Sequence, residues 1–484
     1  MNVLLTAPTG YIGRRLTVKL LEEKDVHLRL FVDDIRRVGE ASLQNVEIVE
    51  GDVFNAEDLR RAVTGIETAY YPIRLFWAGA EFDESQKIFA EKFRDACIRA
   101  GVKKIIYLGV LGSDNTGDNL LRNMIETGEV LSALPDNIRT IWLRAGFVVG
   151  SGSSLFEVLR NLVQKVPVIF TPRWMEAKLA PVGIADTLEY LTKARNLEGQ
   201  DSVVIDLGAE VISFRDMLKV TLKVMGLKRV FIPLPFTAHR LFSFLLMMVT
   251  PFSYKLSFLF IQTLKSRSVL PAGMDRDKAR RYFPGISPLT FQGALERALN
   301  AIERNQVISR WTDSLAGISY ADPEDEISRA VYRDIRTMDF GSLPPEKIFR
   351  AITSIGGRQG WFTFDILWKM RGLIDKLTGG FGTALGKRVE SELRIGDMLD
   401  VWKVVDLRDN KRLLLEAQMK VAGKAWLEFT IEGTTLVQTA YHLPKGLFGR
   451  LYWYAMLPFH FFIFRDMIES IVKRAEAGDE KKSF

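Results

Sequence analysis

Short apolar stretches alternate with helical patterns through the first third of the chain. Predicted strands lie at residues 3–5, 27–32, 46–49, 69–73, 104–108 and 140–143. Between them, apolar residues recur at helical spacing in the segments 16–21, 56–63, 84–100 and 124–133. Strands that alternate with helices in this way predict a parallel sheet with helices on both faces. The sequence therefore indicates a doubly wound α/β domain.

The turn after the first strand has the composition of a dinucleotide-binding turn. Small residues let the backbone approach a diphosphate, and the following helix offers free N–H groups to its negative charge. Gly10 and Gly13 hold two of the expected glycine positions, whereas Ala7 stands at the first. A purely structural turn is the alternative. The residues predicted to contact a cofactor here are Thr6, Ala7, Thr9, Gly10, Tyr11, Ile12 and Gly13.

Acidic residues follow the second and third strands. A carboxylate at Asp33 would accept hydrogen bonds from ribose hydroxyls and repel a 2′-phosphate, which favours NAD over NADP. That preference would be reversed by nearby arginines, namely Arg14, Arg36 and Arg37. Asp52 suits a contact with adenine. A turn or helix-capping role is the alternative for both carboxylates.

The remainder of the chain suggests a covering lobe and a second domain. Residues 150–305 look irregular and rich in proline and aromatic residues, as expected of excursions over the carboxyl edge of the sheet. The polar stretch 306–328 reads as a linker. Predicted strands at 412–420, 425–432 and 434–442 indicate an antiparallel sheet. A helix begins near Pro345, and a long helix covers about 447–474 with a kink near Pro458. We therefore expect domains at 1–305 and 329–484. The second is expected to be an α+β domain in which a curved sheet wraps around a long helix and encloses a cavity.

The composition excludes several kinds of site. Cys97 is the single cysteine, which rules out a disulfide scaffold and a cysteine-rich zinc site. The four histidines lack metal-ligand spacing, so no metal is expected. The 66 basic and 59 acidic residues, net +7, are spread along the chain, so nucleic acid is not an expected partner. The start of the chain lacks the pattern of a secretory signal, and a cytoplasmic location is expected.

Two uncharged, mostly apolar runs of 14 residues each lie at 241–254 and 451–464. A membrane-spanning helix needs about 20 such residues. We expect each run to form a helix that is buried in protein, with peripheral contact with a membrane surface as the alternative.

Aromatic and isolated polar residues mark the interior of the second domain. His442 and His460 stand in apolar surroundings and are expected to be core residues. Strand alternation puts Glu428 on the face opposite Leu427 and Phe429, which predicts solvent exposure. The tryptophans expected in the core, or in the walls of a ligand pocket, are Trp361, Trp368, Trp402, Trp426 and Trp453.

Several motifs carry a family resemblance. The runs 9–14, 51–53 and 107–112 resemble the atypical short-chain dehydrogenase/reductase branch that includes NmrA-like and complex I accessory-subunit-like proteins. The runs 121–129 and 170–174 are similar to those of bacterial members fused to a C-terminal domain of unknown function. Residues 361, 368–373 and 451–460 resemble that domain, which is itself similar to the START/polyketide-cyclase (SRPBCC) superfamily of hydrophobic-ligand binders with a helix-grip fold. The resemblance implies a Rossmann-type domain that binds NAD or NADP, with further cofactor contacts at Val53, Leu108 and Gly109.

The chain departs from this branch at the catalytic positions. Active members place a tyrosine and a lysine four residues apart, so that the lysine lowers the pKa of the phenol. No such pair occurs near residues 115–135. Met124 stands at the lysine-like position and Gly109 where a serine is frequent. The remaining polar candidates near the expected nicotinamide are Arg122, Asn123 and Glu126, with Arg173 and Tyr71 as further possibilities.

Arg122 and Glu126 could instead form a salt bridge on the helix surface. Three functions are therefore open: oxidoreduction of a bulky apolar substrate such as a lipid, quinone or isoprenoid; cofactor binding without catalysis, in a redox sensor or assembly factor; and lipid binding at a membrane surface. The sequence does not indicate an oligomeric state.

Overall fold

The computed structural model describes residues 1–39, 46–72, 80–112, 119–265, 275–314, 323–362, 365–389 and 392–477. The chain forms two compact units. The first comprises Met1–Thr250 and Leu256–Ile318, and the second comprises Pro251–Lys255 and Ser319–Phe484.

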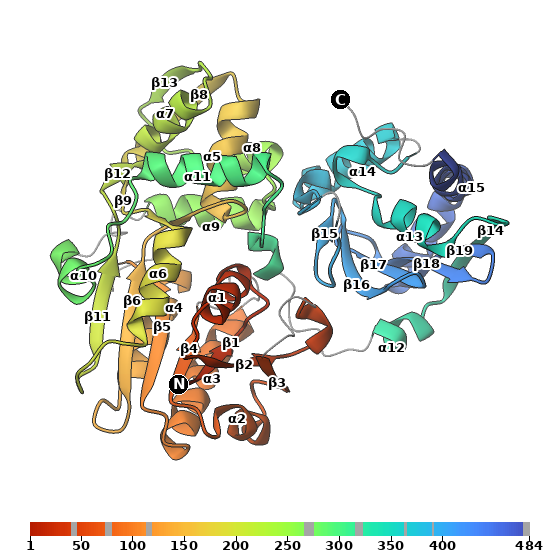
Figure 1. Ribbon diagram of the computed structural model, residues 1–484. Coiled ribbons are helices and arrows are strands. Elements are labelled where there is room, and N and C mark those ends of the chain that lie inside the picture. Colours follow the sequence, from red (N-terminus) through yellow and green to blue (C-terminus); the bar gives the residue numbers. More distant parts are fainter. Residues whose placement is uncertain are drawn as a thin grey trace. The chain divides into compact units, whose positions relative to one another are not determined.

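The first unit is built on a seven-stranded sheet in the order β11-β6-β5-β4-β1-β2-β3 (Figure 1). All neighbouring strands in it are parallel, which confirms the predicted doubly wound sheet. Its strands are β1 (Asn2–Thr6), β2 (His27–Val32), β3 (Val46–Glu50), β4 (Thr68–Tyr71), β5 (Lys104–Val110), β6 (Arg139–Ala145) and β11 (Val203–Leu207). Residue 73, the predicted end of the fourth strand, lies outside the described residues.

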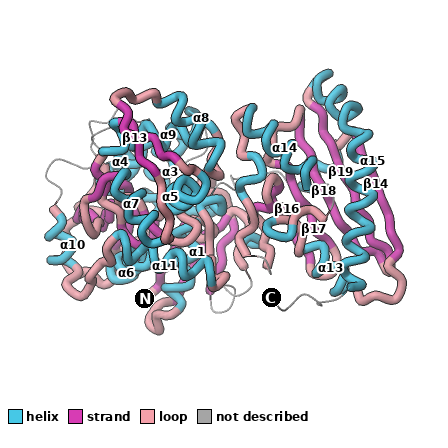
Figure 2. Tube along the Cα trace, turned by 90° about the horizontal axis from the view of Figure 1, so that it is seen from above, coloured by secondary structure: helices cyan, strands magenta, loops and turns pink. Residues whose placement is uncertain are grey.

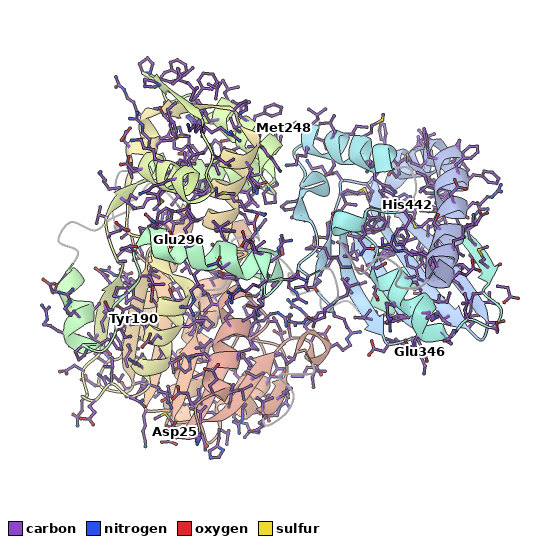
Figure 3. The ribbon with its side chains drawn as sticks, turned by 45° about the horizontal axis from the view of Figure 1, so that its top comes forward. Asp25, Tyr190, Met248, Glu296, Glu346 and His442 are labelled. Carbon is purple, nitrogen blue, oxygen red and sulfur yellow. The ribbon has the colours of Figure 1, made fainter. Side chains whose placement is uncertain are left out.

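Both faces of this sheet are buried because successive strand residues enter different cores. Val3 and Leu5 pack in one core, with Tyr190 (Figure 3), whereas Leu4 packs in the other, with Phe93. Continuous apolar strands are typical of parallel sheets covered on both sides. The helices over the first core are α1 (Tyr11–Leu21) and α6 (Ile184–Ala194); those over the second are α2 (Ala56–Val63), α3 (Ala80–Arg99) and α4 (Asn119–Ser132).

Residues 148–314 are more regular than the sequence pattern suggested. They form three two-stranded sheets, β7–β10, β8–β13 and β9–β12, and a set of helices. Each strand has only two to five residues, too few for the alternation that identifies a strand in sequence. The strands are β7 (Val148–Val149), β8 (Val168–Pro172), β9 (Lys178–Leu179), β10 (Val182–Gly183), β12 (Ile212–Ser213) and β13 (Val230–Leu234). The helices are α5 (Ser154–Lys165), α7 (Phe214–Val224), α8 (His239–Val249), α9 (Tyr254–Lys265), α10 (Arg276–Tyr282) and α11 (Phe291–Glu303), with short 3-10 turns η3 (Arg173–Glu176) and η4 (Trp311–Ser314). A further 3-10 turn, η1 (Ile35–Arg37), follows β2.

The second unit is an antiparallel sheet with helices, in the order β14-β19-β18-β17-β16-β15. Three of its strands match the three predicted from sequence. The strands are β14 (Tyr332–Asp339), β15 (Met398–Leu399), β16 (Trp402–Arg408), β17 (Arg412–Ala417), β18 (Gly423–Glu432) and β19 (Thr435–Pro444). The helices are α12 (Pro323–Ser328), α13 (Pro345–Thr353), α14 (Asp365–Leu377) and α15 (Gly446–Ala477), with 3-10 turns η5 (Gly357–Gln359) and η6 (Gly382–Leu385).

The core of the second unit lies between one face of the sheet and α15, which runs along β14 and β19 (Figure 2). Leu427 and Phe429 of the sheet meet Met467 and Ile471 of the second half of α15. Four of the five predicted core tryptophans are buried, and Trp368 is half-buried. Trp361 stacks on Trp368 at 4.8 Å between ring centroids and donates from Nε1 to Asp400.

Glu428 corrects a prediction. It lies on the face opposite Leu427, as expected, but it is buried rather than exposed. Arg412 donates to it at 2.5 Å and also contacts Asp406 at 3.1 Å and Glu324 of α12. The hydroxyl of Tyr441 donates to Glu428 at 2.6 Å. Buried charges require such partners, and the partners here come from strands and a helix that no alternation pattern on β18 reveals.

Both isolated histidines of this unit are at least partly buried beside aromatic rings. The Nε2 of His442 lies 3.2 Å from the carbonyl oxygen of Gly449, and its ring stacks on that of Trp453 (Figure 3). The ring of His460 lies 5.0 Å from that of Trp453 between centroids. Burial lowers the pKa of His460 to about 4, with Arg336 and His442 acting in the same direction and Asp334 opposing them.

We therefore predict that acid destabilises the second unit through His460. The unfolded chain binds a proton near pH 6.5, whereas the folded unit resists it until about pH 4, so stability is lost as the pH falls between these values. In urea unfolding, the free energy of unfolding should be about 1–2 kcal/mol lower at pH 5 than at pH 7. In His460→Phe this difference should disappear. His27→Phe, at the exposed start of β2, is the matched control. An equal acid loss in wild type and His460→Phe would contradict this assignment.

Candidate cofactor site

A close approach between backbone segments holds α1 against the end of β1. A Cβ at Gly13 would lie 2.2 Å from the carbonyl oxygen of Ala7 and 2.7 Å from Cα of Pro8. Ala7 adopts φ +50°, a left-handed conformation that favours glycine, so this position retains the geometry of the missing first glycine. The turn therefore has the tight shape that the spacing predicted, with strain stored at Ala7.

The first helical amides of α1 lie at the carboxyl edge of the sheet. Gly10 caps the helix without a side-chain hydrogen bond, and Arg14 N–H donates to its carbonyl at 3.0 Å. Such a helix end attracts an anion because its N–H groups lack partners within the helix. The backbone N–H of Tyr11, however, donates to the hydroxyl of Ser314 at 3.1 Å. A Cβ at Gly10 would lie 3.2 Å from the same oxygen.

Residues 307–314 bring Ser314 to this turn, and we call them the strap. The hydroxyl of Ser309 donates to the carbonyl of Tyr11 at 2.8 Å and accepts from Arg15 at 2.9 Å. Trp311 N–H donates to Gly152 at 2.8 Å. The strap falls within the predicted linker 306–328, and the sequence analysis did not include its residues in the site. Its apolar residues Val307 and Trp311, both buried, were the signal that this stretch packs on the first unit.

Asp33 directly follows β2, where a ribose contact was predicted. Its carboxylate accepts from Arg37 at 2.9 Å, and both side chains are largely buried. Arg14 donates to the carbonyl of Arg37 at 2.8 Å and lies 3.7 Å from the carboxylate of Asp313 in the strap. Acidic and basic groups thus meet at the end of β2. Arg36 instead pairs with Asp34.

The other predicted contacts take different places around the turn. Asp52 Oδ1 accepts from the N–H of Phe54 at 2.8 Å, a turn-forming bond, and Val53 is buried in the core. Thr6 donates to the carbonyl of Tyr70 at 3.1 Å. The hydroxyl of Tyr11 donates to Ser151 at 3.3 Å, and burial raises its pKa. Thr9 is buried and Ile12 packs at the edge of the core with Leu108.

The packing around Gly109 leaves no room for a serine side chain at this position. A Cβ at this position would lie 2.2 Å from Nε1 of Trp142, and one at Gly128 would lie 2.3 Å from the same indole. Trp142 fills the space between β5 and α4. Neither position accepts a side chain unless the indole moves.

The polar residues of α4 have different surroundings. Arg122 and Glu126 make an exposed pair at 3.9 Å, whereas Asn123 Nδ2 is buried and has no hydrogen-bond partner in the part of the chain that the structure describes. Met124 is buried, and its carbonyl accepts from Tyr107 at 2.8 Å. Burial raises the pKa of Tyr107 well above its ordinary value.

The two further candidates are separate from α4. Tyr71 packs among the rings of Phe89, Phe93 and Tyr107 in the core, and Arg173 is exposed at the start of η3. Over the described residues, no group of three or more His, Cys, Asp or Glu side chains is placed to hold a metal ion.

Comparisons with known proteins agree with this geometry. Residues 8–134 match a family described as NAD(P)H-binding, and residues 327–467 match a protein family of unknown function, DUF2867. No curated protein sequence matches the chain.

Among solved structures, triphenylmethane reductase of Citrobacter sp. is similar with a TM-score of 0.52 and 17% identity, over 62% of this chain and 100% of that chain. The same reductase complexed with NADP(H) gives a TM-score of 0.50 and 18% identity, over 61% and 99%. A nucleoside-diphosphate-sugar epimerase of Staphylococcus aureus gives 0.50 and 16%, over 61% and 100%. These likenesses show that the first unit has the Rossmann fold of these reductases and epimerases.

We predict that Gly109→Ser does not restore a catalytic serine but destabilises the first unit. The added side chain must displace the indole of Trp142, and overpacking of this kind costs about 1–3 kcal/mol. Denaturant unfolding measures the change. Gly285→Ser is the control, because a Cβ there meets only Lys193 Nζ at 3.6 Å. Equal stability of the two variants would contradict the packing argument.

Proposed function

We propose that the first unit binds NAD or NADP at the β1–α1 turn and supports hydride transfer with a bulky apolar substrate. The observation that carries this proposal is the amide end of α1 at Gly10, Tyr11 and Ile12. Gly10 and Gly13 have no side chains that would crowd this turn. The NAD(P)H-binding match over residues 8–134 supports it. A bound nicotinamide would supply the hydride donor or acceptor, while these residues would hold its diphosphate.

The end of β2 supports both forms of the cofactor, with NAD favoured. The carboxylate of Asp33 is an acceptor for ribose hydroxyls, which selects NAD. Its pairing with Arg37 at 2.9 Å, with Arg14 nearby, offsets part of its repulsion for a 2′-phosphate. These arginines thus weaken the preference for NAD over NADP that Asp33 alone would give.

The chemistry proposed for this site transfers hydride without a protein proton relay. Tyr107 does not serve as an acid or base at neutral pH, because its pKa is raised and its hydroxyl is committed to Met124. An acceptor that takes hydride at an electron-poor carbon needs no simultaneous proton. Quinones, conjugated apolar compounds and triphenylmethane dyes, the last named for the Citrobacter reductase, belong to this class.

The second unit supports the apolar nature of the substrate. Its arrangement, with a long helix along an antiparallel sheet, agrees with a START-like ligand-binding domain. The ring centroids of Trp361, Trp368 and Trp402 lie within 6.5 Å of one another. Among the described residues, the buried Nε1 atoms of Trp368 and Trp402 have no hydrogen-bond partner. Buried indole N–H groups normally find an acceptor, which a ligand oxygen would supply. We propose that this unit shelters a lipid, quinone or isoprenoid.

A cofactor-binding protein without catalysis is the second candidate. Trp142 fills the place of the serine, and the candidates on α4 form a surface pair rather than an acid–base cluster. Such a protein would report redox state or support an assembly by binding the cofactor alone.

Turnover separates the two candidates. We predict that the full chain oxidises NADH or NADPH in the presence of an apolar quinone or a triphenylmethane dye, and less with a small polar ketone. Absorbance at about 340 nm, where reduced nicotinamide absorbs, follows the oxidation of the cofactor. Cofactor binding without oxidation by any acceptor would exclude the first candidate and support the second.

We also predict that Ser314→Ala binds the cofactor more tightly than wild type. The hydroxyl of Ser314 occupies the N–H of Tyr11, so a diphosphate must displace it, and one neutral hydrogen bond corresponds to about three- to tenfold in affinity. Calorimetric titration measures the change. Ser202→Ala, which removes a similar bond to the N–H of Thr140 at the opposite edge of the sheet, is the control. Unchanged affinity in Ser314→Ala would show that the diphosphate does not use this amide.

A further inference from the structure

The first half of α15 exposes large apolar side chains. Phe448 is 82% exposed and Leu447 71%, and the exposure continues past Pro458. In the second half of the same helix, Met467, Ile468 and Ile471 are buried against the sheet. The exposed members of the first half are Leu447, Phe448, Leu451, Tyr454, Leu457, Phe459, Phe461 and Phe462.

These residues recur at helical spacing, so they form a continuous surface. Leu447, Leu451, Tyr454 and Phe462 are separated by steps of three, four and eight residues, which place them along one side of the helix. Aromatic rings are frequent along this surface. An exposed apolar area of this extent marks an interaction site rather than ordinary surface.

A second apolar stripe lies on α14, next to the first. Met370, Leu373, Ile374 and Leu377 are each about half exposed and follow helical spacing. Arg371, beside this stripe, lies 5.7 Å from the ring centroid of Tyr452 on α15 and donates to the carbonyl of Lys420 at 2.9 Å. The Arg371–Tyr452 contact therefore brings α14 beside the first half of α15. We call the two stripes together the apolar face of the second unit.

The charges around the apolar face are basic. Lys445 directly precedes α15, Arg450 lies in its first half, and Arg465, which pairs with Glu469 at 3.2 Å, lies just past its midpoint. No acidic residue occurs between positions 445 and 465. On α14, the carboxylate of Asp375 is buried and accepts from the backbone N–H groups of Gly382 and Lys420. The apolar face is thus bordered by Lys445 and Arg450, while the carboxylate of Asp375 on α14 is engaged inside the unit.

We propose that the apolar face binds the surface of an anionic lipid bilayer, with the first half of α15 and the exposed side of α14 lying in the headgroup region. Apolar and aromatic side chains with a basic border are the pattern of interfacial helices, since rings enter the headgroup layer and cations attract anionic lipids. Within the described ranges, no helix is long and apolar enough to cross a membrane, so the contact is peripheral. This inference is independent of cofactor binding by the first unit.

Vesicle flotation of the full chain tests the proposal. The protein is expected to float with vesicles of phosphatidylcholine and phosphatidylglycerol, less with phosphatidylcholine alone, and less at high salt. Phe448→Asp with Leu451→Asp should reduce binding at least about tenfold, because charges cannot enter the headgroup boundary at low cost. Lys445→Glu with Arg450→Glu should remove the preference for anionic vesicles. Val230→Asp on β13, at a residue 60% exposed in the first unit, is the matched control and should bind normally.

Three outcomes would overturn the proposal. One is the absence of flotation with anionic vesicles. Another is equal flotation of wild type and the Phe448/Leu451 double variant. The third is that the double variant binds vesicles normally but changes the oligomeric state measured by light scattering, which would assign the apolar face to a contact between copies of the chain.

A spin label covers the case in which the double variant fails to fold. Phe448→Cys leaves the rest of the apolar face in place, and the native Cys97 is buried. The label at position 448 should become less mobile when anionic vesicles are added, whereas a label at Val230→Cys should keep its mobility. Unchanged mobility at position 448 would equally contradict the proposal.

Discussion

The contact of Gly13 with the backbone of Ala7 and Pro8 fixes the start of α1 against the end of β1. Since the first amides of a helix have no partners within it, this contact places N–H groups that lack helical partners at the carboxyl edge of the sheet. The parallel order of the strands brings the ends of β1, β2 and β5 to the same edge. The proposed cofactor site therefore depends on a backbone approach so close that a Cβ at Gly13 would lie 2.2 Å from the carbonyl oxygen of Ala7, which only glycine permits. The strap meets the same amide, which makes Ser314 a competitor for the diphosphate.

The two units differ in where they place charged and apolar side chains. In the first unit, strands buried on both faces leave the chemistry to the ends of the strands. In the second, the outer face of the sheet contains the charged group of Arg412, Asp406 and Glu428, while a large apolar surface of α14 and α15 remains exposed. Charges are thus buried where partners exist, and apolar side chains are exposed where no part of the described chain covers them. The large exposed apolar surface is the physical basis for the proposal that α15 contacts a membrane surface.

The sequence predicted those features that depend on local pattern. Alternating strands and helices were enough for the parallel sheet, and the spacing of Gly10 and Gly13 located the turn, because periodicity and tight turns are encoded within a few residues. It did not predict Ser314, which reaches Tyr11 from 303 positions away. Likewise, alternation assigned Glu428 to the correct face but not to a buried environment, since its partner Arg412 belongs to another strand. The run 451–464 was expected to be buried, but Leu451 and Phe462 are exposed, because a run of apolar residues does not show whether another element covers it.

Hydrogen exchange of backbone amides, followed by mass spectrometry, tests the central claim most directly. The full chain is compared with and without saturating NADH or NADPH. If the β1–α1 turn holds the diphosphate, exchange should slow in peptides that cover residues 9–14, and it should quicken in peptides that cover the strap as Ser314 leaves Tyr11. Unchanged exchange in both segments, with the fold intact, would contradict the account.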